Sequence, residues 1–341
     1  MTEPITVIIP TYNKADYISQ TIESVLNQTY LNYEIVIIDD CSIDDTRNVV
    51  EKYLADNVRY FKHDTNWGPG ATFNDGIGKS NSEYITIIAS DDTLLPNHLE
   101  LIMQEFKKNS LIETVFPRVK TVDENGKNLH SIVEQKFTDK YKLLNYLFYV
   151  GNAMPSPGIA FNKSLFRKTP AFNSALIQLH DYDLNVRALM YGKTSVVPVP
   201  TVLYRRFLEP TVNLSANVRW LNTCHLIETK IVLDNFLNMN YKDIVNVFPQ
   251  LHKYNEAEIK FRLLVDTCKN RQYRLSSWAF ERLIYYIETD DSIFKNNKFN
   301  FQYKDYINLY RLNAQNLIGR SHKERLYYNL TRVIRRLFGL E

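Results

Sequence analysis

Two adjacent carboxylates, Asp91 and Asp92, lie at a position in the sequence where acidic side chains could bind a cation. They follow residues 84–89, an apolar stretch that predicts a buried strand. At the frayed carboxyl end of such a strand, both acids can turn toward one ligand in the crevice where open α/β sheets bind ligands. A divalent cation with diphosphate oxygens suits them. A solvated turn whose acids cap the helix beginning near Pro96 explains the same pair.

The elements that must position these acids alternate between strands and helices over the first hundred residues. Short β-branched runs predict strands, and apolar residues at helical spacing predict helices between them. The expected strands are residues 5–9, 34–38, 58–61 and 84–89, and the expected helices are residues 15–28, a helix after Asp45, and residues 71–78. Because the connections are short, the pattern predicts a doubly wound sheet with helices on its faces.

The next hundred residues continue this pattern, and then the chain changes style. We expect a helix at 99–106, a strand at 114–116, a hairpin turn around Asn125-Gly126, a loop at 151–158, a strand at 159–162, a helix from His180 to Gly192, and an edge strand at 196–202. Long helical segments follow, the clearest at 220–236 and 256–269. The predicted domains are therefore 1–210, with a nucleotide-binding half (1–100) and an acceptor-binding half (101–210), and a helical region at 211–341.

Composition and charge exclude several classes of protein. A net charge of +3 over 341 residues gives no global field for nucleic acid, so we expect no nucleic acid partner. The cysteines Cys41, Cys224 and Cys268 lie far apart and form no zinc or disulfide pattern. Residues 1–4 lack the basic region of a secretory signal, and no run reaches the roughly 18 apolar residues of a membrane span. We expect a cytoplasmic protein, or one held at the inner face of the cell membrane.

Four motifs in order resemble the inverting family 2 glycosyltransferases of the GT-A fold, of the type that builds bacterial surface glycans. They are residues 7–13, 37–42, 90–92 and 181–183, each after an expected strand or at the start of an expected helix. The likeness covers about residues 4–207. It implies an α/β fold with a doubly wound mixed sheet flanked by helices, here followed by the helical region. It also implies transfer of a sugar from a nucleotide-diphosphate sugar to a hydroxyl group.

The resemblance also implies where the donor binds. The residues it assigns to the nucleotide sugar are Pro10, Thr11, Tyr12, Asn13, Asp39, Asn74, Ser90 and Asp91. In this assignment Tyr12 stacks on the base, and Asp39 accepts a hydrogen bond from the imide N–H of uracil, which favours UDP. A turn aromatic at Tyr12 and a helix cap at Asp39 remain alternatives.

The metal motif implies Mn²⁺ or Mg²⁺ held jointly by Asp91 and Asp92, with the cation acting as a Lewis acid on the leaving group. The chain departs from the family pattern at two positions. Many relatives carry an arginine where Phe73 stands, and an aspartate where Ala89 stands. A phosphate contact is therefore missing or comes from elsewhere, and the division of roles between the two acids stays open.

Asp181 is the implied catalytic base that takes the proton of the acceptor hydroxyl, in the sequence His180-Asp181-Tyr182-Asp183. Asp183 is expected to orient the helix start, since it falls in the first turn. Three roles are open for His180: it contacts the acceptor, it adjusts the basicity of Asp181, or it is a structural histidine. Relatives often have a histidine shortly after the position of Tyr204-Arg205, where this chain has Arg206 and Phe207.

The expected partners are a nucleotide-sugar donor, with UDP as the expected nucleotide, and a glycan or lipid-linked acceptor in cell-surface polysaccharide synthesis. Residues 320–338 combine basic and apolar side chains at helical spacing, which suits peripheral contact with an anionic membrane and equally suits docking on the helical region. The alternative to an enzyme is a catalytically silent glycan-binding or scaffolding protein that kept the fold. The oligomeric state, the donor sugar and the linkage are not encoded in any motif.

Overall fold

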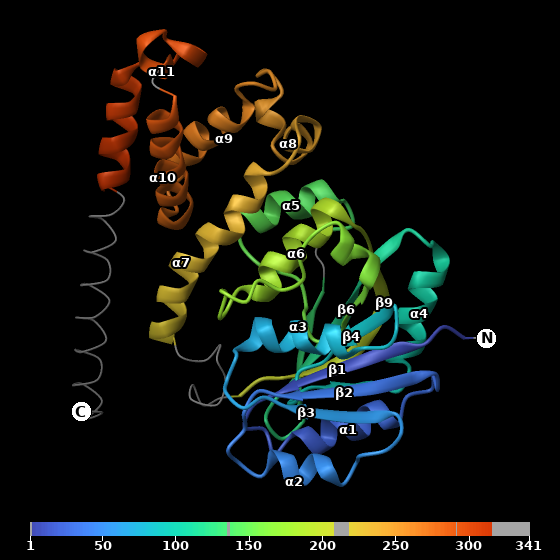
Figure 1. The fold of residues 1–341 in the computed structure, drawn as a ribbon. Coiled ribbons are helices and arrows are strands. Elements are labelled where there is room, and N and C mark those ends of the chain that lie inside the picture. Colours follow the sequence, from blue (N-terminus) through green and yellow to red (C-terminus); the bar gives the residue numbers. More distant parts are fainter. Residues whose placement is uncertain (1, 135–136, 208–217, 291, 316–341) are drawn as a thin grey trace, which may run out of the picture. The chain divides into compact units, whose positions relative to one another are not determined.

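The computed structural model describes residues 2–134, 137–207, 218–290 and 292–315 (Figure 1). Its contacts divide the chain into two compact units, the first ending at Asn235 and the second beginning at Phe236. The domain boundary expected after residue 210 falls in a segment outside the described ranges and stays a prediction. The division by contacts comes within helix α7 (Val218–Leu237). The first unit carries the sheet, and the second is helical.

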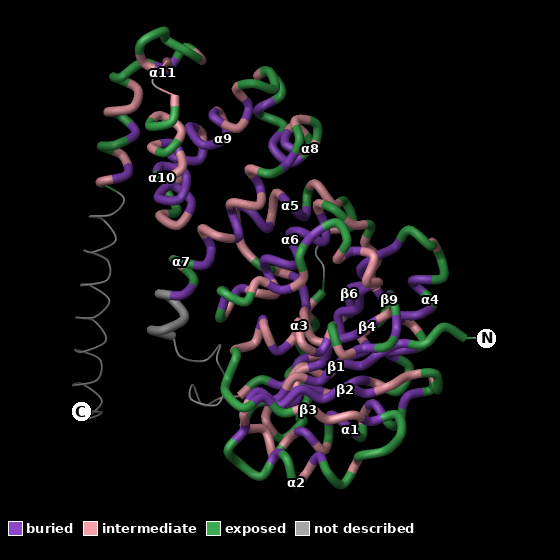
Figure 2. The backbone as a smooth tube through the Cα atoms, in the orientation of Figure 1, coloured by how far each residue is buried: buried purple, intermediate pink, exposed green. Residues whose placement is uncertain are grey.

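The first half of the sheet is parallel and matches the expected strands. Its members are β1 (Ile5–Thr11), β2 (Tyr33–Asp39), β3 (Val58–Lys62) and β4 (Tyr84–Ile87), in the spatial order β3-β2-β1-β4. The central strands β1 and β2 are buried along most of their length (Figure 2). Burial on both faces explains why they read as continuous apolar runs. Their carboxyl ends meet at one edge, where Thr11 pairs with Asp39.

Helices cover both faces of this half. In Figure 1, α1 (Ile18–Leu26) and α2 (Thr46–Glu51) lie on one face, and α3 (Pro69–Lys79) lies on the other. The helix α3 packs closely on β1 because Gly76 has no side chain: a Cβ there would lie 2.5 Å from Cγ2 of Ile8. The positions of these three helices follow from the alternating pattern of the sequence. The close approach of α3 to β1 at Gly76 depends on tertiary packing.

The second half of the sheet is mixed and continues in the order β4-β8-β6-β9-β5, with β7 paired to β6. The strands are β5 (Thr93–Leu94), β6 (Ile112–Val122), β7 (Asn128–Val133), β8 (Ile159–Asn162) and β9 (Lys193–Arg205). The helices are α4 (His98–Lys108), α5 (Lys140–Tyr149), the 3₁₀ helix η1 (Lys163–Arg167) and α6 (His180–Tyr191). The architecture is the predicted mixed sheet flanked by helices.

Two strands differ in extent from their predictions. β6 is much longer than the expected 114–116, because it continues into the hairpin whose turn contains Gly126 with φ of +84°. β9 also extends further than 196–202, and it pairs with β6 on one side. On its other side β5 pairs only with Val202 and Leu203, so the part that contains Pro198 and Pro200 has the edge character expected of it.

The second unit contains α8 (Tyr241–Val247), η2 (Pro249–Leu251), α9 (Ile259–Cys268), α10 (Tyr273–Thr289), α11 (Ser292–Lys295), η3 (Lys298–Asn300) and a helical stretch at 303–315. The expected helices at 220–236 and 256–269 are α7 and α9. Within the described ranges, no helix has the length and apolar character needed to cross a bilayer. The predicted basic helix at 320–338 lies outside these ranges.

Candidate active site

Asp92 is the buried member of the acid pair and comes after the end of β4. Its side chain is fully enclosed, and its Oδ1 accepts a hydrogen bond of 2.8 Å from the backbone N–H of Arg205. Its Oδ2 has no hydrogen-bond partner among the residues that the structure describes. Burial and the neighbouring Asp91 carboxylate raise the pKa of Asp92 well above its usual range. An enclosed carboxylate with one oxygen unmatched is a group that a cation would stabilise.

Asp91 is the more accessible acid, and it is paired with a lysine from the first loop. Nζ of Lys14 lies 2.7 Å from Oδ2 of Asp91 and also 5.0 Å above the ring of Phe207. Arg205 holds the turn itself, since its Nε donates to the carbonyl of Asp91 at 2.9 Å. Arg205 is buried, so its guanidinium supports the acid pair and is not exposed to a phosphate.

The donor atoms at this place fit a hard divalent cation. Mg²⁺ is held in many sites by one or two carboxylates together with substrate phosphates. Asp91 and Asp92 supply two carboxylates. Over the described ranges, no cluster of three or more His, Cys, Asp or Glu side chains is arranged to hold a metal ion. The unmatched Oδ2 of Asp92 is the observation in favour of a cation, and the ion would have to displace or share the contact between Asp91 and Lys14.

The loop after β1 presents one exposed aromatic ring on a rigid base. Tyr12 is 46% exposed, which leaves a face open for stacking, whereas Thr11 is buried. Asn13 has φ of +52°, and it joins two loops: its backbone N–H donates to Oγ of Ser42, and its Oδ1 accepts from the N–H of Ile43. Asn13 therefore fixes the position of Tyr12.

Asp39 lies at the end of β2 as expected, but its side chain is 0% exposed. Its Oδ1 accepts from the N–H of Ser42 at 2.7 Å, and its Oδ2 accepts from the hydroxyl of Tyr60 at 2.6 Å. Burial and the bond to Asp39 raise the pKa of Tyr60, so the hydroxyl stays a donor. A contact between Asp39 and uracil would require a change at Tyr60, and it stays a prediction.

Asp40 anchors the loop between β3 and α3. Its carboxylate accepts hydrogen bonds from the N–H groups of Trp67 and Gly68, at 2.7 and 2.9 Å, and lies 2.9 Å from Nδ1 of His63. Nε2 of the same ring lies 3.2 Å from Oδ2 of Asp75 on α3. His63 therefore bridges two carboxylates and ties the end of β2 to α3.

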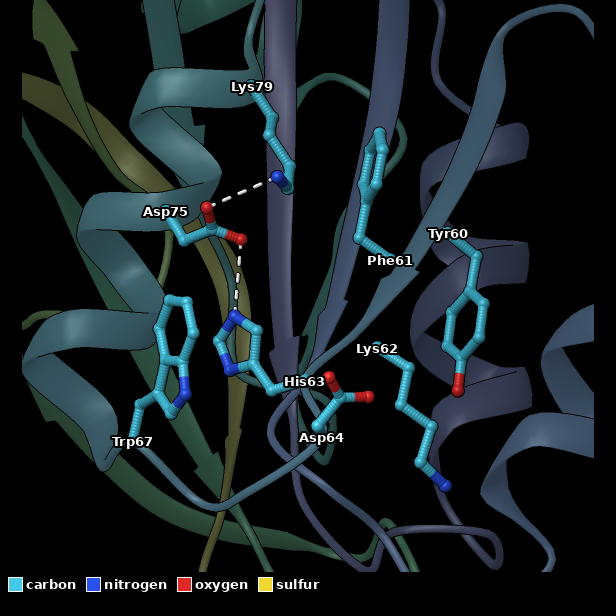
Figure 3. Close-up of a pocket in the computed structure, with 8 residues that line it drawn as sticks. All are labelled: Tyr60, Phe61, Lys62, His63, Asp64, Trp67, Asp75 and Lys79. Atoms are coloured by element: carbon cyan, nitrogen blue, oxygen red, sulfur yellow. Dashed lines mark hydrogen bonds and ion pairs between the residues drawn. The ribbon is translucent and has the colours of Figure 1, made fainter.

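A pocket of about 430 Å³ opens over this bridge (Figure 3). It is lined by Tyr60, Phe61, Lys62, His63, Asp64, Trp67, Asp75 and Lys79. The ring of Trp67 stacks on His63 at 3.8 Å between centroids, and Lys79 pairs with Asp75. None of the residues predicted from sequence lines this pocket, so it adjoins the predicted donor site without being part of it.

Asn74 and Phe73, both on α3, hold the loop that leads to α6. Nδ2 of Asn74 donates to the carbonyl of Phe172 at 2.8 Å, and its Oδ1 accepts from the N–H of the same residue at 2.9 Å. Phe73 stacks on Phe172 with ring centroids 4.6 Å apart, and its centroid lies 5.3 Å from that of His180. Phe73 thus makes an aromatic contact where many relatives carry an arginine, and the expected contact of Asn74 with the donor stays a prediction.

Asp181 stands in the first turn of α6, held from the loop at 151–158. Its Oδ2 accepts from the hydroxyl of Ser156 at 2.6 Å and from Nδ2 of Asn152 at 3.2 Å. Its Oδ1 accepts from the N–H of Tyr182 at 2.6 Å. These donors are neutral and hold the Asp181 carboxylate in one orientation, and a general base must be positioned within reach of the proton that it takes. Next to it, Nδ1 of His180 is buried without a hydrogen-bond partner in the described ranges.

The loop at 151–158 also connects Asp181 to the acid pair. Two residues after Ser156, the N–H of Gly158 donates to the carbonyl of Ile87, the last residue of β4, at 2.7 Å. Asp91 lies four residues beyond Ile87. On the other side, the contact between Phe73 and His180 links α3 to the residue before Asp181. The loop at 151–158 therefore contacts both Asp181 and the end of β4.

Ser90 is buried beside the acid pair, and Pro10 is partly buried at the end of β1. The sequence did not point to several residues that fix the site: Lys14, Asn152, Ser156, Asp40 and, on α7, Glu228. The motif position of Lys14, two residues after Tyr12, was a signal that could have found it. Most of the others act through contacts between distant parts of the chain, such as Ser156 and Asp181, which are 25 residues apart, and no local pattern encodes such contacts.

Comparison with known proteins identifies a family match over residues 6–169. The family model described as Glycosyl transferase family 2 matches residues 6–169. Residues 6–169 are a family 2 glycosyltransferase domain. The match contains the loop after β1, the end of β2 and the Asp91-Asp92 pair, while Asp181 lies beyond its end.

Similar proteins carry related names. The chain is 39% identical over 137 residues to an uncharacterized glycosyltransferase of Rickettsia bellii, a stretch that covers 39% of this chain and 19% of that protein. It is 28% identical over 189 residues to chondroitin synthase of Escherichia coli, covering 55% of this chain and 27% of the synthase. The chain thus spans less than a third of the length of either relative.

A solved structure supports the fold over nearly the whole chain. The fragment 1–349 of S. aureus TarS, in complex with UDP, superposes with a TM-score of 0.56 and 18% identity, and the match covers 92% of this chain and 91% of the fragment. At this identity the likeness concerns the fold. The structural match covers 92% of this chain, so it includes the helical region as well as residues 6–169.

Proposed function

We propose that the protein is a metal-dependent inverting glycosyltransferase, which moves a sugar from a UDP-sugar to a hydroxyl group of a glycan or lipid-linked acceptor in cell-surface polysaccharide synthesis. The observation that carries the proposal is the loop at 151–158, which binds Asp181 through Ser156 and is bonded to the end of β4 through Gly158. This loop contacts the acid that suits a general base, and it also contacts the strand after which the proposed cation-binding acid pair comes. The family 2 domain and the UDP bound by a TarS fragment of the same fold support a UDP-sugar donor.

In the proposed reaction, the acceptor hydroxyl gives its proton to Asp181 as its oxygen forms a bond to the anomeric carbon. The bond from that carbon to the diphosphate oxygen breaks, and its electron pair leaves with UDP. Attack opposite the leaving group inverts the configuration, through a transition state with oxocarbenium character. Tyr12 would stack on the base, and Asp91 with Asp92 would hold Mn²⁺ or Mg²⁺. That ion would supply charge neutralisation at the diphosphate.

Release of UDP from a panel of UDP-sugars, with and without a glycan acceptor mixture, tests this function. We expect turnover with Mn²⁺ or Mg²⁺ for at least one donor and loss of turnover with a chelator. We also expect Asp91→Ala and Asp92→Ala each to remove most turnover. Nucleotide-sugar binding without release for any donor would contradict the proposal and would favour a catalytically silent glycan-binding protein.

A further inference from the structure

Glu228 lies on α7, beyond the end of the family 2 match, and contacts the turn that leads into α6. Its side chain is 4% exposed. Its Oε1 accepts a hydrogen bond from the backbone N–H of Ile177 at 2.9 Å. Its Oε2 accepts from the N–H groups of Gln178 and Leu179, at 2.9 and 2.7 Å. One buried carboxylate thus binds consecutive backbone donors across about fifty residues of sequence.

Two of these donors lie in the turn just before α6, and the third belongs to Leu179, the N-cap residue, which offers no side-chain acceptor to the first turn. A negative charge near a helix start is favourable because the helix dipole is positive there. Glu228 therefore fixes the backbone that enters α6 and places a charge beside it, from a different element. Asp181 stands two residues after Leu179.

A second contact from α7 reaches the same turn. Nδ2 of Asn235 donates to Oδ1 of Asp183 at 2.8 Å. The other oxygen of Asp183 pairs with Arg187 at 2.6 Å, and Arg187 also donates to the carbonyl of Ala171. The first turn of α6 is therefore held on both sides of Asp181. The carboxylate of Asp181 itself accepts hydrogen bonds from the loop at 151–158.

We infer that Glu228 is a positioning residue for Asp181, so that the helix after the family 2 domain sets the geometry of the proposed base. This rests on the proposed function. Without Glu228, the turn at 177–179 loses its acceptors, and the first turn of α6 frays or rotates. Asp181 then lies out of reach of the acceptor hydroxyl in most molecules, while the donor residues on β1, β2 and α3 keep their places. The expected result is slower transfer with unchanged affinity for the nucleotide.

The test uses Glu228→Gln and Glu228→Ala in the full chain. Glutamine keeps the size and one acceptor oxygen, but its NH₂ group meets a backbone donor, so some of the bonds are lost and the fold survives. The control is Ile227→Ala, which changes the adjacent residue of the same helix, 62% exposed to solvent. We expect Glu228→Gln to lower kcat for sugar transfer about tenfold or more, because Asp181 is then displaced from the acceptor hydroxyl in most molecules. A tenfold loss corresponds to about 1.4 kcal/mol. The dissociation constant for UDP should stay within about twofold.

Hydrogen exchange followed by mass spectrometry gives a readout that does not depend on activity. Peptides covering residues 177–182 should exchange faster in Glu228→Gln than in the wild type, while peptides from β1 and β2 should be unchanged. Normal transfer and normal exchange at 177–182 in Glu228→Gln would overturn the inference, as would UDP affinity falling in step with kcat. If the wild type itself transfers no sugar, the proposed function fails, whereas the exchange measurement still reports whether Glu228 holds the turn.

Discussion

At the scale of single residues, the acids of the candidate site divide by exposure. Asp39 and Asp92 are enclosed, and each accepts a hydrogen bond from a backbone N–H group. Asp91 and Asp181 are only partly buried, and they contact the side chains of Lys14 and Ser156, respectively. Removing a buried acid leaves a backbone donor unpaired, which costs about 1–3 kcal/mol in stability. The turnover of Asp92 variants should therefore be compared with their free energy of unfolding, which separates a loss of activity from a loss of stability.

A buried histidine gives a prediction on pH. His98 is fully buried between the hydroxyl groups of Thr201 and Thr86, and burial lowers its pKa to about 3. Between pH 6.5 and 3 the unfolded chain binds a proton that the folded protein does not, so the free energy of unfolding falls as the pH falls. The slope is at most about 1.4 kcal/mol per pH unit.

Urea unfolding of wild type and His98→Gln between pH 7 and 4.5 checks this. We expect the substitution to lower stability at pH 7, because the bonds to the threonines change. The acid-dependent loss should be shallower than in the wild type, since glutamine does not titrate. Parallel pH profiles for the two proteins would show that His98 does not contribute to the acid sensitivity.

At the scale of elements, the packing of α3 on the sheet is set by Gly76. A Cβ at this position would lie 2.5 Å from the side chain of Ile8, so Gly76→Ala forces the helix or the strand to shift. We expect a loss of about 1–3 kcal/mol in the free energy of unfolding. Gly78→Ala is the matched control on the same helix, because a Cβ there meets no atom within 4 Å. It should be neutral or stabilising by up to about 1 kcal/mol.

Denaturant unfolding of the two variants measures the difference directly. Equal stability of Gly76→Ala and Gly78→Ala would contradict the close approach of α3 to β1. Because Asn74 and Phe73 lie on the same helix and hold the loop before α6, Gly76→Ala is also expected to weaken UDP binding more than Gly78→Ala does.

The elements themselves were largely predictable from sequence. The strands β1 to β4 and β8, the helices α1 to α4 and the hairpin at Asn125-Gly126 follow from apolar periodicity and turn residues, which are local signals. Sequence also placed Asp91, Asp92 and Asp181 at a strand end and a helix start. It did not predict the length of β6, the burial of Asp39, or the contact from Glu228 to α6. These depend on partners that tertiary folding brings together, such as Tyr60 for Asp39.

At the scale of the whole molecule, the sheet unit ends within α7 and not before it. Glu228 and Asn235 bind α6 and the turn before it, which makes this part of α7 a structural component of the sheet unit. The family match ends at residue 169 and so includes neither α6 nor α7. The domain boundary expected after residue 210 stays a prediction, while the contacts of the described residues divide the chain between Asn235 and Phe236.

Two fragments test where the unit ends. We expect residues 1–235 to unfold cooperatively on heating, because Glu228 and Asn235 are retained. Residues 1–210 lack both, and hydrogen bonds to a charged group contribute about 1.5–3 kcal/mol each. That fragment should be less stable by at least about 2 kcal/mol or fail to fold. A fragment 1–210 as stable as 1–235, measured by thermal and urea unfolding, would place the boundary at the earlier position.

The central claim is that Asp181 is the base of a site whose donor half is formed separately by β1, β2, α3 and the end of β4. The most direct measurement compares Asp181→Asn with the wild type, in UDP affinity by calorimetry and in the rate of sugar transfer. Asparagine keeps the size of the side chain and can still accept from Ser156, but it cannot take a proton. We expect Asp181→Asn to bind UDP with an affinity within about twofold of the wild type and to transfer sugar about 10²-fold more slowly or worse. Transfer at a near-normal rate by Asp181→Asn would contradict the central claim.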